Sequence, residues 1–118
     1  LKKIKKKNYT FCGTGDEKRS WMYVKDAVKI IKLSIVKSKK QIRIIDAPGN
    51  ITLKNKAMIK LIYKLSKILE KPRFNGVLRK GDPVNLSSNT IDLRRMGFKK
   101  YTTLKNGLKN YIKWFKKR

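Results

Sequence analysis

The clearest pattern of hydrophobic and polar positions lies between residues 57 and 69, where apolar side chains recur at helical spacing. The apolar positions are Ala57, Met58, Leu61, Ile62, Leu65, Ile68 and Leu69. Intervals of three and four residues place these side chains along one face of a helix. The segment therefore predicts an amphipathic helix, and we expect Thr52 to cap its start and Pro72 to end it.

Three other segments have weaker helical periodicity. Asp26 is a favourable N-cap, and apolar positions within residues 27–35 predict the helix that follows it. A short helix is expected before Gly97, which closes it. Thr102 or Thr103 is expected to cap a last helix. Its apolar face comprises Leu104, Leu108, Tyr111, Ile112 and Phe115.

Alternating polar and apolar positions predict short strands between these helices. One strand is expected to lead into Gly13. A second carries Arg19, Trp21 and Tyr23 on one face, because successive side chains of a strand point to opposite sides. Two further strand candidates are Ile42–Ile45 and Phe74–Leu78.

The order of these elements predicts an α/β chain with α+β character. Its 118 residues allow one domain, so we treat residues 1–118 as a single region. The basic ends, residues 1–7 and 116–118, are expected to fray. No apolar run is long enough to cross a membrane.

Charge and composition narrow the possible functions. The chain has 33 basic and 7 acidic residues, a formal charge of +26, which favours non-specific binding to polyanions. Its lysines are spread along the chain rather than clustered. Without histidine, and with Cys12 as its single cysteine, it offers no zinc site and no Ser-His-Asp scheme. A lone cysteine also fits a reducing compartment, so we expect a cytoplasmic protein.

Two motifs carry candidate binding chemistry. Arg19 lies on a predicted strand beside the Gly13-Thr14-Gly15 turn, where its guanidinium can bind a phosphate through two hydrogen bonds. Arg79 and Asp82 flank Gly81 in a second turn. There an arginine can contact phosphate, while an aspartate accepts hydrogen bonds from ribose hydroxyls.

These motifs, in this order, resemble the C-terminal part of an extended short-chain dehydrogenase/reductase. That family comprises NAD(P)-dependent nucleotide-sugar epimerases and dehydratases. The matching residues are Gly13 and Gly15, the Arg19-x-Trp21-x-Tyr23-Val24-x-Asp26 pattern, Arg79-x-Gly81-Asp82, Gly97-Phe98 and the Leu104–Trp114 segment. The resemblance implies that Arg19 and Arg79 contact the diphosphate of a nucleotide sugar and that Asp82 contacts its ribose. It also implies the substrate-binding part of a Rossmann-type enzyme.

The family's other signatures are absent from this sequence. It has no Gly-x-x-Gly-x-x-Gly turn for the cofactor. Tyr101 and Lys105 have the spacing of the catalytic Tyr-x-x-x-Lys pair but the wrong place among the motifs. We therefore expect no catalytic, cofactor-binding or metal-binding residue in this chain, and no activity from it alone. The resemblance implies a parent protein with an N-terminal Rossmann half that binds NAD or NADP, and allows a homodimer of that parent.

Two other functions are compatible with the sequence. A basic protein of this kind can be a non-enzymatic component of a ribonucleoprotein, held by phosphate contacts. It can also lie on an acidic membrane surface, although no segment has the lysine-flanked apolar face of such helices without also resembling ordinary core.

Overall fold

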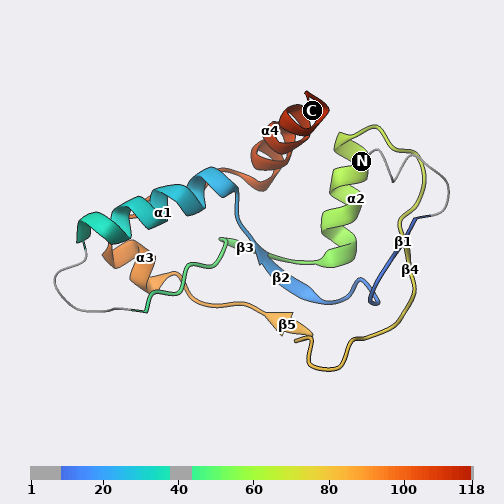
Figure 1. Ribbon diagram of the computed structural model, residues 1–118, viewed down its shortest axis with the longest axis horizontal. Coiled ribbons are helices and arrows are strands. Elements are labelled where there is room, and N and C mark those ends of the chain that lie inside the picture. The colour runs from blue at the N-terminus through green and yellow to red at the C-terminus, as the bar shows by residue number, and fades with distance from the viewer. Residues whose placement is uncertain (1–8, 38–43, 118) are drawn as a thin grey trace.

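The computed structural model describes residues 9–37 and 44–117 (Figure 1). They form a flat, mixed α/β structure with overall extents of 53 × 36 × 19 Å. The strands are β1 (Thr10–Phe11), β2 (Lys18–Trp21), β3 (Ile51–Lys54), β4 (Arg73–Phe74) and β5 (Asn85–Leu86). The helices are α1 (Val24–Lys37), α2 (Asn55–Leu65), α3 (Ile91–Arg95) and α4 (Leu104–Lys116).

Strand β2 forms the centre of a three-stranded sheet. It pairs antiparallel with β3 and parallel with β5, so that Arg19 lies between Leu53 and Leu86. A separate pair, β1 and β4, is parallel and aligns Phe11 with Phe74. The sheet separates the α1–α3 end of the molecule from the end that carries α2, β1 and β4 (Figure 1).

The hydrophobic core is small and lies mainly under α1. Ile30, Leu93 and Phe98 form its buried cluster. Near the opposite end of the molecule, Met58 and Tyr63 of α2 are buried as well. Much apolar surface remains exposed, especially on α1, where one stripe comprises Val24, Val28, Ile31 and Ile35.

The start of α1 differs from the prediction. The helix begins at Val24, and the backbone oxygen of Tyr23 accepts hydrogen bonds from the amides of Asp26 and Ala27. Asp26 is therefore inside the first turn rather than at the cap. Its buried carboxylate instead accepts hydrogen bonds from the backbone amide and hydroxyl of Thr102, at 2.6 and 3.0 Å.

The helix predicted from the strongest apolar stripe is present but shorter than expected. Thr52 is in β3 and caps nothing, because α2 begins only after Lys54. The helix ends at Leu65 rather than near Pro72. Lys67 has a φ of 56°, and the Ile68 amide returns to the Tyr63 oxygen at 2.9 Å. This left-handed turn satisfies the end of the helix before the proline is reached.

The strands are also shorter than the alternation indicated. The strand predicted to include Tyr23 ends at Trp21, and of the strand predicted at 74–78 only Phe74 is in a strand, as the last residue of β4. Ile44 and Ile45 are in no strand; the remainder of that candidate lies outside the described residues. Sequence reasoning missed β5 altogether.

The two C-terminal helices agree well with the prediction. Gly97, with a φ of 91°, follows α3 as expected. Thr103 is the N-cap of α4, where its hydroxyl accepts from the Asn106 amide at 3.4 Å. The basic segment 1–7 falls outside the described residues, as does residue 118, whereas Lys116 still belongs to α4.

Candidate functional site

The three residues predicted to bind a nucleotide sugar line one pocket. Arg19 comes from β2, and Arg79 and Asp82 come from the loop between β4 and β5, 60 or more positions later. The pocket has a volume of about 220 Å³. Its other lining residues are Cys12, Gly13, Glu17, Asn55, Val77 and Leu78.

Backbone pairing on both sides positions Arg19. The residue is partly buried in the central strand, next to Leu53 of β3 and Leu86 of β5. One guanidinium nitrogen, Nη1, donates to the Lys18 backbone oxygen at 2.8 Å. An arginine has five N–H donors in a planar fork, so most of them stay available for a ligand.

Arg79 and Asp82 are positioned by a tight turn, as the sequence predicted for this segment. The Asp82 amide donates to the Arg79 oxygen at 3.1 Å, and Gly81 has a φ of 89°. A positive φ at the third position defines a type II turn, in which glycine is favoured. The described ion pairs include none between Arg79 and Asp82, so each charge remains free to meet a ligand.

The loop that carries Arg79 is fastened to the Gly-rich turn after β1. The Asn75 Oδ1 accepts from the amides of Gly13 and Val77, both at 3.0 Å. The Gly76 amide donates to the Gly13 oxygen at 2.9 Å. Two walls of the pocket, distant in sequence, are thereby held in a fixed relation.

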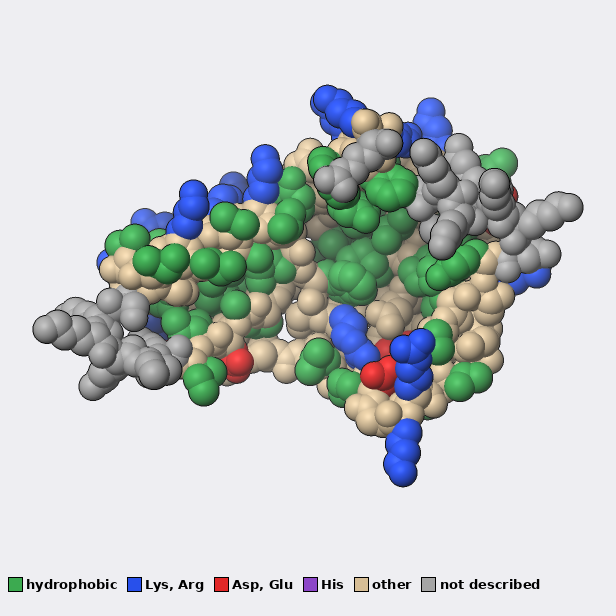
Figure 2. All heavy atoms as spheres, viewed as in Figure 1, with side chains coloured by type: hydrophobic (Ala, Val, Ile, Leu, Met, Phe, Trp, Pro, Cys, Tyr) green, Lys and Arg blue, Asp and Glu red, His purple; other side chains and the backbone are tan. Residues whose placement is uncertain are grey.

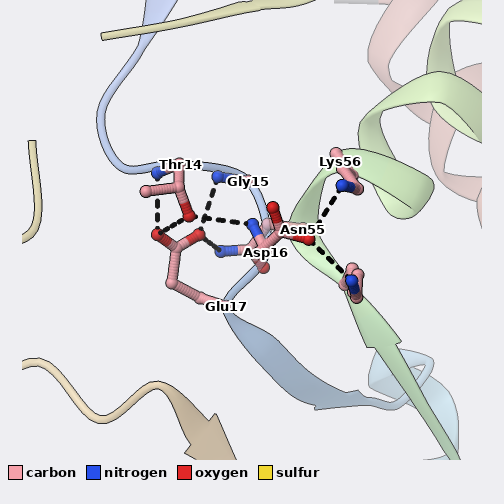
Figure 3. Close-up of polar contacts among 7 residues, drawn as sticks. Thr14, Gly15, Asp16, Glu17, Asn55 and Lys56 are labelled. Carbon is pink, nitrogen blue, oxygen red and sulfur yellow. Dashed lines mark hydrogen bonds and ion pairs between the residues drawn. The ribbon is translucent and has the colours of Figure 1, made fainter. Parts of the chain in front are cut away.

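Glu17 organises the Gly-rich turn, and sequence reasoning missed it (Figure 3). The residue is only 6% exposed. Its carboxylate accepts from the Thr14 amide at 2.8 Å, the Thr14 hydroxyl at 3.0 Å and the Gly15 amide at 3.0 Å. Hydrogen bonds from Thr14 and Gly15 lower the pKa of Glu17 despite its burial. The sequence feature that could have indicated this role is the position of Glu17, two residues after the Gly13-Thr14-Gly15 turn.

The position of Glu17 determines what the turn can bind. Backbone amides in such turns are common anion sites, but those of Thr14 and Gly15 already bind the carboxylate. A side chain at Gly15 would come within 2.8 Å of the Phe74 ring, so the turn is tightly filled. These two amides are therefore not free to bind a phosphate, and the cationic groups that line this pocket are the two arginines.

A second group of charges lies outside the pocket, on the solvent side of the turn. Asp16 forms ion pairs with Lys54 at 2.7 Å and Lys56 at 2.8 Å (Figure 3). These two lysines lower the pKa of Asp16 to about 2. They join the turn to the start of α2, which also supplies Asn55 to the pocket.

A different cavity, about 190 Å³, lies beside α4 and is mostly apolar. Trp21 and Tyr23 line it from the end of β2, and Leu108 and Tyr111 line it from α4. The Trp21 indole nitrogen is buried without a hydrogen-bond partner. Gly107 brings α4 close to Tyr23, since a side chain there would meet the tyrosine at 3.1 Å. We interpret this cavity as loose packing between elements.

Comparisons with known proteins give no independent identification. No family model matches this chain, and no curated protein matches it either. Over residues 9–37 and 44–117, the helices are too short and too polar to cross a membrane. The same part of the chain contains no cluster of three or more His, Cys, Asp or Glu side chains that could hold a metal ion.

Proposed function

We propose that this chain binds the nucleoside diphosphate part of a nucleotide sugar. It would be the C-terminal substrate-binding part of an NAD(P)-dependent, Rossmann-type epimerase or dehydratase. One observation carries the proposal: Arg19, Arg79 and Asp82 line a single pocket although they are far apart in sequence. In this proposal the two guanidinium groups neutralise the diphosphate, and Asp82 accepts hydrogen bonds from the ribose.

The size and chemistry of the pocket support binding of part of such a ligand. Pockets for complete small molecules usually measure roughly 300–1,000 Å³, whereas this one is about 220 Å³. A diphosphate and its ribose would occupy it, with the base and sugar extending beyond it. The Glu17 carboxylate also lines the pocket, but its oxygens accept from donors of the turn, and the two arginines would offset its negative charge.

The chemistry at the sugar would belong to a part of the parent protein outside this chain. That part would supply the bound NAD or NADP and the catalytic residues. The exposed stripe of Val24, Val28, Ile31 and Ile35 on α1 is consistent with a further body packed against it, since contiguous exposed apolar surface marks interaction sites.

Calorimetric titration with nucleoside diphosphates and with inorganic pyrophosphate tests the proposal. Arg79→Ala should weaken both ligands, because losing a charge-assisted hydrogen-bond pair costs about 1.5–3 kcal/mol, or roughly tenfold or more in affinity. Lys80→Ala is the matched control: it removes the same charge from the same turn, but Lys80 does not line the pocket. Equal losses in the two variants would reduce the site to general electrostatic attraction.

Asp82 separates nucleotide recognition from simple anion binding. Asp82→Asn should weaken a nucleoside diphosphate several-fold and leave pyrophosphate unchanged or slightly tighter, because only the nucleotide has ribose hydroxyls. Failure of every nucleoside diphosphate to bind at millimolar concentration would contradict the proposal. NAD and NADP should bind no more tightly than a nucleoside diphosphate, because the chain lacks the Gly-x-x-Gly-x-x-Gly turn of a dinucleotide site.

A ribonucleoprotein component remains the second candidate, supported by the formal charge of +26. Any protein with this charge binds RNA at low salt, so the discriminating quantity is binding to one defined RNA at physiological salt. We expect release there without preference among RNAs. Retention of one RNA would favour this second function.

A further inference from the structure

A further cavity among residues 9–37 and 44–117 differs in chemistry from the two already described. It is a shallow groove of about 460 Å³ between α1 and the segment that follows α3. We call it the lysine groove. Its lining residues are Lys29, Lys32, Leu33, Val36, Gly97, Phe98, Lys99 and Lys100.

Helix periodicity and one glycine turn build the lysine groove. On α1, residues 29, 32, 33 and 36 recur at intervals of three and four and so lie on one face. Opposite them, the positive φ of Gly97 reverses the chain after α3. The Phe98 amide then bonds to the Leu93 oxygen at 2.9 Å. Phe98 is thereby directed into the core, while Lys99 and Lys100 stay exposed.

The floor of the groove offers apolar surface to a ligand. Val36 is 79% exposed, and Leu33 packs partly against the buried core cluster. On the side of α1 that faces the viewer, Figure 2 likewise shows exposed hydrophobic side chains with lysine or arginine side chains at their edge. An exposed apolar surface with a charged rim is typical of a protein interaction site.

The charges around the floor have one sign. Four lysines line the groove and no carboxylate does. The carboxylate that bonds to Lys29, at 3.1 Å, belongs to Asp26, which is itself buried and also bonded to Thr102. By contrast, the pocket of Arg19, Arg79 and Asp82, which we call the proposed nucleotide pocket, combines two arginines with two carboxylates. The cavity beside α4 has no charged lining residue.

We propose that the lysine groove binds an acidic amphipathic peptide segment of a partner protein. Apolar side chains of that segment would cover Val36 and Leu33, as in other complexes where a helix fills a groove. Its carboxylates would pair with the four lysines. The inference is independent of the proposed nucleotide pocket.

The other occupants fit the groove less well. A second copy of the chain would bring another formal charge of +26 to the same surface. RNA would use the lysines but leave the apolar floor uncovered. Helices that bind membranes present large apolar residues such as Trp, Phe and Leu on their apolar face, whereas the exposed apolar residue of this groove is a valine.

The test uses three labelled peptides and fluorescence anisotropy at physiological ionic strength. The first peptide is a short helix with leucines at positions i and i+4 surrounded by glutamates. The second replaces every glutamate with glutamine, and the third replaces both leucines with serine. We expect the first to bind at least about tenfold more tightly than the others, because both charge complementarity and apolar burial are required.

Paired variants on α1 locate the binding surface. Val36→Ser should weaken the first peptide about tenfold, while Ile35→Ser, at a neighbouring position that is 70% exposed but outside the groove, should change it less than about twofold. Lys32→Gln should weaken it about threefold, and Lys25→Gln, on the same helix but outside the groove, should have little effect. All four positions are exposed in part or in full, so each variant should fold.

Four outcomes would overturn the proposal. The first peptide could fail to bind at millimolar concentration, or it could bind no better than its glutamine version. The groove variants and their controls could lose affinity equally. Finally, phosphatidylcholine–phosphatidylserine vesicles or polyuridylate could bind more tightly than the peptide and lose affinity with Val36→Ser, which would assign the groove to a lipid or RNA surface instead.

Discussion

Two buried carboxylates stabilise different parts of this molecule, and they act over very different distances in sequence. Glu17 binds amides only two and three residues away and orders the turn beside the pocket lined by Arg19, Arg79 and Asp82. Asp26 binds Thr102, 76 residues away, and joins α1 to the segment before α4. The same chemical group thus shapes a local site in one case and closes the fold in the other.

The two carboxylates also differ in what opposes their charge. Burial raises the pKa of Asp26, but hydrogen bonds from Thr102 and Lys29 outweigh it, and the net pKa is lowered. For Glu17, hydrogen bonds from the turn dominate over burial. Loss of Asp26 should therefore destabilise the whole chain, whereas loss of Glu17 should loosen one turn.

The largest effect is expected from Asp26→Ala. The substitution leaves the Thr102 amide and hydroxyl without their acceptor, and breaking a buried charged interaction typically costs about 3 kcal/mol or more. Urea unfolding measures the loss. Asp26→Asn should cost less, because its amide oxygen can still accept from Thr102. A loss below about 1 kcal/mol for the alanine variant would show that α1 is held mainly by Ile30 and its neighbours.

Glu17→Ala should have a smaller and more local effect. Its amide partners lose a charged acceptor, which costs about 2 kcal/mol, but water can reach the open pocket and limit the loss. Hydrogen exchange provides the discriminating measurement. The Thr14 and Gly15 amides should exchange faster, while those of α1 should change little. Uniform acceleration along the chain would instead make Glu17 a global element like Asp26.

Gly15→Ala tests how tightly the turn is packed. Gly15 has a φ of 81°, and a side chain there would contact the Phe74 ring at 2.8 Å and the Lys56 side chain at 3.0 Å. We expect a loss of roughly 1–2 kcal/mol, from backbone strain and displacement of the ring. Gly81→Ala is the control, because Gly81 has a similar φ of 89° with open space around it. Equal losses in urea unfolding would mean that packing against Phe74 contributes nothing.

The sequence predicted the helices better than their ends. Apolar periodicity is a local property, so α2 and α4 could be found from spacing alone. Their boundaries depend on packing: Leu69 continues the apolar stripe of α2, yet it is 96% exposed, beyond the turn at Lys67. The two-residue strand β5 has no alternation to detect, because its pairing with β2 is a tertiary contact.

The candidate site could be predicted only in part. Motif resemblance identifies Arg19, Arg79 and Asp82, and the structure brings them together in one pocket. Their role in substrate binding is still a prediction. Glu17 was overlooked, since its role depends on how the turn folds over it. Asp26 was predicted as a helix cap from local preference, but its partner Thr102 is too distant in sequence for any local rule to identify.

The smallest effect on stability is expected from Asp16→Asn, because Asp16, unlike Glu17 and Asp26, is an exposed carboxylate. Its pKa is about 2, compared with an ordinary value of 3.8. A carboxylate with a lowered pKa in the folded state stabilises the fold above its unfolded pKa, and this contribution disappears as the pH falls through the folded pKa.

The stability difference between the wild type and Asp16→Asn should therefore be present at neutral pH, shrink below about pH 4 and vanish near pH 2. It should also diminish in high salt, because exposed ion pairs are screened. Urea midpoints across this pH range provide the measurement. A difference that persists unchanged at pH 2, or that resists salt, would mean that Asp16 acts through the shape of the turn rather than through its charge.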